Sequence, residues 1–239
     1  MYPMCQLRRM VFLSIQTVGI GRELGDLPER MKELWVKSNQ WKNECGYEEM
    51  YLRESGLLAE FGKIIQINAG RIKEIDAEGN VVRAKIISIE GEEVDILEKM
   101  REIFKEVTMS SLCGHHIKEF TIPFLIKRFR INGINKIPEC LHVFGKKPWE
   151  ITCLDTGELW QAGGRGRTSL ELISEVMGLN EDREGSEGDD TIHDLYWSKR
   201  PEKIREIGIR KVLKTINLLL KLNGHDTIRY DDIEFERIT

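Results

Sequence analysis

Three potential metal ligands lie close together near the middle of the chain: Cys113, His115 and His116. Thiolate and imidazole groups are the ligands that zinc prefers, but a structural zinc site needs four of them. The sequence has no second cluster of cysteine and histidine to complete the set. We therefore do not expect a metal site at this position.

A basic segment rich in glycine, residues 163–167, is a candidate for phosphate binding. Its glycines allow a close backbone approach, and the guanidinium groups of Arg165 and Arg167 match the geometry of phosphate oxygens. The segment lacks the lysine of a nucleotide-binding P-loop. We expect a basic loop that is either solvated or in contact with a nucleic-acid backbone.

Charge is unevenly distributed along the chain, although the formal net charge is only -4. Basic residues crowd the middle of the sequence: Lys127, Arg128, Arg130, Lys136, Lys146, Lys147, Arg165 and Arg167. Acidic residues crowd residues 180–194, where three small residues also occur, and this composition predicts a mobile acidic loop. Both clusters are equally compatible with ordinary solvated surface.

The length and composition fit an ordinary α/β protein rather than a membrane or disordered one. The chain has 239 residues with no internal repeat or long linker, so we expect one domain over residues 1–239. Polar residues from Ser14 onward interrupt the first apolar run too early for a signal sequence. Five cysteines without C-x-x-C spacing favour reduced thiols and a cytoplasmic protein. The composition gives no sign of membrane contact.

The hydrophobic pattern predicts the elements that would position the polar residues. Residues 10–17 are typical of a central strand, and residues 27–49 predict a helical insertion after it. Runs rich in β-formers at 63–69 and 81–89 predict a hairpin. Further predicted elements alternate between helix and strand: a helix over 92–107, a strand over 110–114, a helix over 119–132, a strand over 150–154, a helix capped by Thr168 and Glu171 that ends near Met177, and a long helix from Pro201 to about Asn223.

Three segments of this alternating half carry a resemblance to a known family. Residues 113–120 read Cys-Gly-His-His-Ile-Lys-Glu-Phe, residues 145–150 read Gly-Lys-Lys-Pro-Trp-Glu, and residues 154–160 read Leu-Asp-Thr-Gly-Glu-Leu-Trp. They resemble predicted 3'-5' exonucleases related to the proofreading domain of family B DNA polymerases, over about residues 10–222. These belong to the DEDD exonucleases, so the resemblance implies a ribonuclease H-like fold: a mixed β-sheet flanked by helices.

Active members of this family hold two magnesium or manganese ions with four carboxylates, and a tyrosine positions the attacking water. Every matching position in this chain carries another residue. Ser14 and Gln16 stand in place of an Asp and a Glu on the first strand, and Thr121 stands in place of the next Asp. In the final Tyr-x-x-x-Asp motif, Ile207 replaces the tyrosine and Lys211 replaces the aspartate.

These replacements change the formal charge of the four ligand positions from about -4 to about +1, so they no longer suit a pair of hard divalent cations. We therefore expect neither a metal cofactor nor hydrolysis. The family geometry directs Lys211 toward the first strand, where its ammonium would lie near Ser14 and Gln16 and could bind a phosphate. The predicted nucleic-acid-binding residues are Lys211, Arg165, Arg167 and Lys127.

The first hypothesis is an inactive exonuclease homologue that binds the backbone of single- or double-stranded nucleic acid, or a protein partner. The second is a metal-dependent 3'-5' exonuclease with displaced ligands. The third is a protein scaffold without affinity for nucleic acid. A metal in the cleft would favour the second, and an exposed apolar patch without a basic cleft would favour the third.

Overall fold

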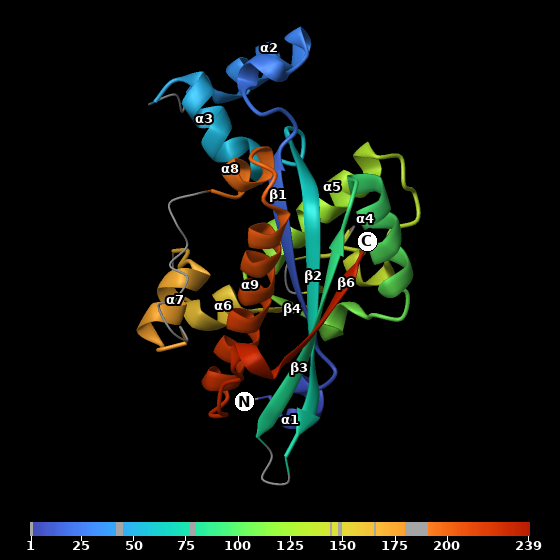
Figure 1. Ribbon diagram of the computed structural model, residues 1–239, viewed down its shortest axis with the longest axis vertical. Helices are drawn as coiled ribbons and strands as arrows, with labels where there is room; N and C mark the ends of the chain where they lie inside the picture. The colour runs from blue at the N-terminus through green and yellow to red at the C-terminus, as the bar shows by residue number, and fades with distance from the viewer. Residues whose placement is uncertain are drawn as a thin grey trace.

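The computed structural model describes residues 2–41, 45–76, 80–143, 145–147, 150–164, 166–179 and 191–239. Within these ranges a mixed six-stranded sheet has the strand order β5-β4-β1-β2-β3-β6 and lies between helices on both faces (Figure 1). The fold is therefore α/β with a mixed sheet, as the alternation of patterns predicted.

The sheet is built around its first strand. Its members are β1 (Val11–Gly19), β2 (Gly62–Ile75), β3 (Val81–Glu90), β4 (Leu112–Gly114), β5 (Leu154–Asp155) and β6 (Ile233–Ile238). The strands β1, β2 and β3 are successively antiparallel, whereas β4 pairs with β1, β5 with β4, and β6 with β3 in parallel. The predicted hairpin is thus confirmed, and β1 has a partner on each side.

Helices occupy both faces of this sheet. They are α1 (Met4–Leu7), α2 (Glu29–Asn39), α3 (Tyr47–Glu54), α4 (Glu93–Ile103), a π-helical turn (Ile117–Thr121) that leads into α5 (Ile122–Ile131), α6 (Thr156–Gln161), α7 (Leu170–Val176), α8 (Ile192–Trp197) and α9 (Pro201–Leu222). Figure 1 shows α4 and α5 on one side of the sheet and α6, α7 and α9 on the other.

Alternate residues of β1 face the two layers. Leu13 and Ile15 belong to the apolar cluster that contains α4 and α5, whereas Phe12 belongs to the cluster that contains α9. A strand buried on both faces needs apolar residues at successive positions, which explains the continuous apolar run at the start of β1. The position of Ser14, on the same face as Phe12, is therefore a polar interruption beneath α9.

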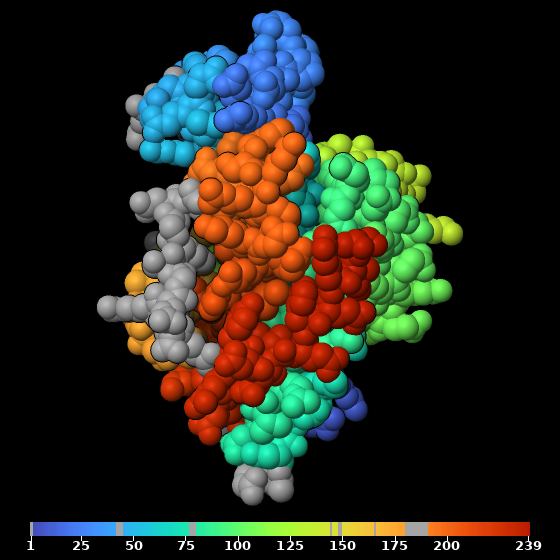
Figure 2. Space-filling model, in the orientation of Figure 1, coloured from blue at the N-terminus to red at the C-terminus, as the bar shows by residue number. Residues whose placement is uncertain are grey.

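The insertion between β1 and β2 has a small core of its own. The ring of Trp35 packs edge-on against Tyr51 and Phe61, with centroid distances of 5.2 and 5.0 Å. The phenol oxygen of Tyr51 accepts a hydrogen bond from the backbone N–H of Gly21 at 3.0 Å, which ties the insertion to the end of β1. Figure 2 shows the insertion projecting at one end of the molecule.

Several predicted boundaries are wrong for local reasons. Ser169 rather than Thr168 caps α7, because its hydroxyl accepts from the N–H of Leu172 while the Thr168 carbonyl accepts from two histidine rings. The strand expected over 150–154 is reduced to β5, the only two residues of that region that pair with β4. The π-helical turn takes up the residues expected to begin α5 in regular helix.

The last residues of the predicted acidic loop, 191–194, belong to the start of α8 and not to a loop. Residues 180–190 lie outside the described ranges, but Thr191 caps α8 and Asp194 completes its capping box, so the end of the predicted loop is helical. The edge strand β6 was missed altogether. Its alternating sequence, Ile-Glu-Phe-Glu-Arg-Ile, is the signal that could have revealed it.

A buried ion pair joins α9 to the sheet. Both carboxylate oxygens of Glu90, at the end of β3, accept hydrogen bonds from Arg205 at 2.6 and 2.8 Å. Burial alone would raise the pKa of Glu90, but Arg205, with Ser88 and Gln66, outweighs it and holds that pKa below its ordinary value. The pair joins α9 to the end of β3 and adds to the apolar contacts that place the helix on the sheet.

Replacing Glu90 with Gln should lower the free energy of unfolding at pH 7 by roughly 2 kcal/mol, because Arg205 loses its carboxylate in a poorly solvated place. The extra stability of the wild type over the Gln variant is present above the ordinary pKa of a glutamate, about 4.3. It is lost as the pH falls through the lowered pKa of Glu90. Urea denaturation at pH 7 and pH 3 measures both effects. A difference that stays constant between these pH values would contradict this role, and Glu206→Gln, in an exposed pair with Arg210, is the control.

Candidate functional site

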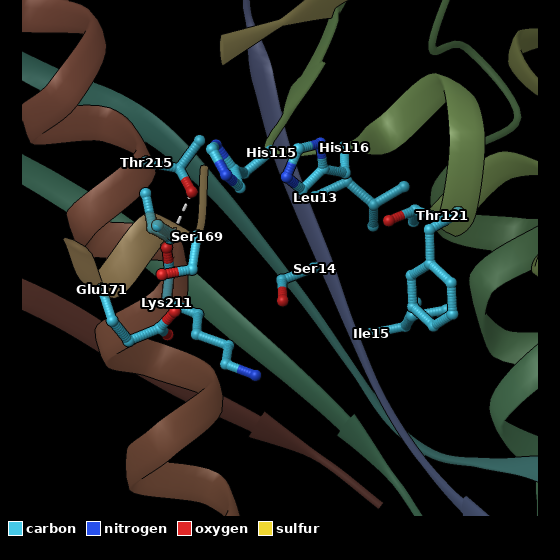
Figure 3. Close-up of a pocket in the computed structure, with 12 residues that line it drawn as sticks. Leu13, Ser14, Ile15, His115, His116, Thr121, Ser169, Glu171, Lys211 and Thr215 are labelled. Carbon is cyan, nitrogen blue, oxygen red and sulfur yellow. Dashed lines mark hydrogen bonds between the residues drawn. The ribbon is translucent and has the colours of Figure 1, made fainter. Parts of the chain in front are cut away.

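A pocket of about 210 Å³ opens between β1 and α9. We call it the β1–α9 pocket; Figure 3 shows the residues that line it: Leu13, Ser14, Ile15, His115, His116, Phe120, Thr121, Ser169, Leu170, Glu171, Lys211 and Thr215. Three of them, Ser14, Thr121 and Lys211, are positions singled out by the family resemblance. Ser14 and Lys211, which are far apart in the sequence, thus line the same pocket.

The position of Lys211 agrees with the prediction made from the last motif. Its side chain is half-buried and extends from α9 toward β1 (Figure 3). Ile207, one turn earlier on the same helix, is also half-buried but lines neither this pocket nor the groove beside it. Of these two residues, Lys211 is therefore the one that a ligand in the pocket or the groove would meet.

A larger groove of about 560 Å³ adjoins the pocket. We call it the β1–α8 groove; it runs past the second half of β1, α3, α8 and the turn after α3, and it shares Ile15, Phe120 and Lys211 with the pocket. Gln16 lines this groove together with Lys211, and its Nε2 is buried without a hydrogen-bond partner among the described residues. The pocket and the groove form one continuous cleft along β1.

The lining of the groove is mixed rather than strongly basic. Apolar side chains such as Val18, Leu52, Leu57 and Ile192 contribute to it, and its acids and bases occur side by side. Arg53, for example, is paired with Glu49 at 2.5 Å. The groove thus suits a ligand with apolar parts better than a uniformly charged one.

The sheet beneath α9 carries two rows of polar side chains at this end. In the first row Gln16 pairs across the strands with Gln66 and Gln66 with Glu90; in the second, Ser14 pairs with Asn68 and Asn68 with Ser88. Asn68 donates to Gln66 at 2.9 Å and Gln66 donates to Glu90 at 3.1 Å, so the chain of hydrogen bonds leads to the Arg205 ion pair. Ser14 and Gln16 were singled out from the sequence, whereas Gln66, Asn68, Ser88 and Glu90 were not.

Gly208 lets α9 approach this polar network closely. A Cβ atom added there would lie 2.2 Å from Nδ2 of Asn68 and 2.4 Å from Oε1 of Gln66. Both side chains are buried and bonded to each other, so neither can move aside without breaking the network. Gly208 lies three residues before Lys211 and therefore helps to set the distance of the ammonium from β1.

Two histidines form the wall of the pocket away from the groove. The rings of His115 and His116 both contact the carbonyl oxygen of Thr168 through Nε2, at 2.9 and 3.2 Å. Nδ1 of His115 lies 3.0 Å from the hydroxyl of Thr156. Burial lowers the pKa of His115, and the Thr168 carbonyl offsets this only in part, so a neutral ring that donates from Nε2 and accepts at Nδ1 accounts for both contacts.

The residues present do not fit a pair of divalent cations. No group of three or more His, Cys, Asp or Glu side chains within the described ranges could hold a metal ion. Two acids of the segments that carry the resemblance are engaged elsewhere: Asp155 accepts from the backbone N–H groups of His116, Lys118 and Gly157, and Glu119 pairs with Arg167. Glu171 is the single carboxylate among the described residues that line the pocket.

The other predicted nucleic-acid ligands do not gather around the pocket. Lys127 is paired with Glu60 at 2.9 Å, and Arg167 with Glu119 at 2.5 Å, while Arg165 lies outside the described residues. Arg128, counted in the basic cluster, is buried and bonded to Glu93 at 2.5 Å. Of the four predicted residues, Lys211 alone lines the pocket within the part of the chain that the structure describes.

Comparison of the chain with protein-family models and with curated proteins found no match. Across the described ranges, no helix has both the length and the apolar character needed to cross a lipid bilayer. The five cysteines are all unpaired, and three of them, Cys113, Cys140 and Cys153, are buried.

Replacing Gly208 with Ala should lower the free energy of unfolding by about 1–2 kcal/mol, although alanine is the better helix former by about 1 kcal/mol. The cost arises because the new methyl group must displace Asn68 or Gln66. Urea denaturation measures it. Gly25→Ala is the matched control, since a Cβ there meets nothing closer than 3.6 Å; a Gly208→Ala protein as stable as the wild type would contradict the close approach of α9.

Proposed function

We propose that this protein is a ribonuclease H-like domain of the exonuclease type that acts by binding and not by hydrolysis. Two features support the fold assignment. An antiparallel hairpin adjoins the first strand, and alternating strands and helices follow with parallel pairing on its other side. The observation that carries the proposal is the convergence of Ser14, Thr121 and Lys211 at one pocket, because the three positions were chosen from the family motifs alone.

The chemistry of these side chains supports the loss of hydrolysis. Two-metal catalysis requires anionic oxygen ligands that hold the cations and lower the pKa of a bound water. Hydroxyl groups at Ser14 and Thr121 and an ammonium at Lys211 supply no negative charge, and the ammonium repels divalent cations. The same change removes much of the repulsion that a bare carboxylate cluster would exert on a phosphate.

The ligand we propose is a single nucleic-acid strand. The ammonium of Lys211 has no hydrogen-bond or ion-pair partner among the described residues, so it is available for a phosphate. Phe120 and Ile15 line the cleft beside it and offer apolar contact to a base or a sugar. A duplex is disfavoured, because the described residues that line the groove include no row of cations such as two backbones would need.

A specific observation also favours a protein partner as the second candidate. Leu52 and Leu57 line the groove and are 48% and 58% exposed, and Glu49 and Asp194 lie on the same surface. Exposed apolar residues with acids beside them are typical of a surface that binds a peptide segment. If no nucleic-acid strand binds, a protein partner becomes the favoured ligand of the groove.

The protein should not shorten a single strand labelled at its 5' end in the presence of magnesium or manganese, because the site cannot hold two cations. Gel analysis of the strand after incubation with the purified protein measures this. Metal-dependent shortening that co-elutes with the protein and is abolished by Glu171→Gln would instead establish a nuclease with displaced ligands.

A single strand should bind weakly and in a salt-dependent manner, because each phosphate contact releases counterions. Lys211→Met should weaken binding and reduce the slope of log K against log salt by about 0.7, the value for one contact on a single strand. Fluorescence anisotropy at several salt concentrations measures both. Lys214→Met, on the same helix but outside pocket and groove, should leave both unchanged; binding that ignores salt, or no binding at low salt, would favour the protein partner.

A further inference from the structure

The side chains at the replaced positions lack hydrogen-bond partners among the described residues, whereas several polar side chains around them have partners. Around them, the side chains of Gln66, Ser88, Glu90 and His115 all have hydrogen-bond partners. The hydroxyls of Ser14 and Thr121 and the ammonium of Lys211 have none among the described residues, and neither has Nε2 of Gln16. Groups that can donate hydrogen bonds have thus replaced acceptors at all four former ligand positions, and they are free.

Free donors that converge on a pocket define a site for an anion. The three N–H groups of Lys211 and two hydroxyls can surround a tetrahedral oxyanion, as they commonly do in phosphate sites. Nε2 of Gln16 is shielded from solvent as it stands and would need a rotation of its amide to join them. A buried donor without a partner is unfavourable, and a hydrogen bond to an anion would remove that cost.

The shape of the cleft distinguishes a strand end from a passing strand. The β1–α9 pocket is open toward the groove through Ile15, Phe120 and Lys211. The two histidine rings form the wall of the pocket at the end away from the groove. Both rings contact the carbonyl of Thr168, in the segment that precedes α7. A chain that lies in the groove would therefore meet this wall at the pocket.

We infer that the β1–α9 pocket binds a terminal phosphate, a phosphate monoester, through Lys211, Ser14 and Thr121. A monoester carries about -1.5 to -2 charges at pH 7 and three free oxygens, more than an internal phosphodiester offers to these donors. Glu171 lines the same pocket, and its carboxylate is an acceptor for a sugar hydroxyl next to the phosphate. The identification of the ligand as a strand end rests on the proposed function. The same three side chains would also bind the phosphate of a free mononucleotide.

Competition against a short, internally labelled oligothymidylate tests the inference. The competitors are the same strand with hydroxyl ends, with a 5'-phosphate and with a 3'-phosphate, and in a second arm AMP against adenosine. One phosphorylated strand should bind roughly 10- to 100-fold more tightly than the hydroxyl strand, the worth of one or two charge-assisted hydrogen bonds. The advantage should vanish in Lys211→Met and persist in Lys214→Met.

The outcomes separate this inference from the proposed function. Equal affinity for phosphorylated and hydroxyl strands would overturn the terminal-phosphate site and leave strand binding intact. Binding of AMP over adenosine that depends on Lys211, without any strand binding, would support the site and reject the strand. If Lys211→Met does not fold, Ser14→Ala should reduce the advantage several-fold, and an unchanged advantage would overturn the inference.

Discussion

The candidate site depends on how α9 lies on the sheet, and the ion pair between Glu90 and Arg205 holds the helix there together with its apolar face. Glu90 also ends the chain of hydrogen bonds that runs from Asn68 through Gln66, so the end of the sheet beneath the helix is polar and these three side chains are linked. Gly208 allows the helix backbone to approach this network within a distance that any side chain would prevent. Lys211, one turn further on, is consequently held opposite Ser14 with its ammonium toward β1.

The polarity of the cleft is the opposite of the one that a cation site needs. A site that holds cations needs acceptors, whereas Ser14, Thr121 and Lys211 offer donors and a positive charge. Neighbouring polar groups such as Asp155 and the two histidines are occupied in holding the backbone. Ser14, Thr121 and Lys211 have no such partner among the described residues, which is why we propose binding of an anion, and not hydrolysis, as the chemistry of the cleft.

Much of the fold follows from patterns that are local in sequence. The apolar run of β1, the hairpin and the amphipathic α9 beginning at Pro201 were predictable because burial on a strand or helix face sets their periodicity. The cap of α7 was not, because Thr168 is drawn away by histidines more than fifty residues distant. The pairing of Lys127 with Glu60, and the burial of Arg128, likewise depend on contacts between separate segments, so a charge cluster in the sequence did not become a basic surface. The position of Lys211 could be predicted only because a family motif linked it to the first strand.

The central claim is that the β1–α9 pocket binds an oxyanion through Lys211, Ser14 and Thr121. The most direct measurement is an anomalous difference map from a crystal of this protein soaked with tungstate, a tetrahedral oxyanion that scatters strongly. Our account predicts a peak in the pocket within hydrogen-bonding distance of the Lys211 ammonium and the two hydroxyls. A map without density there, or a Lys211 side chain turned away from β1 into solvent, would contradict it.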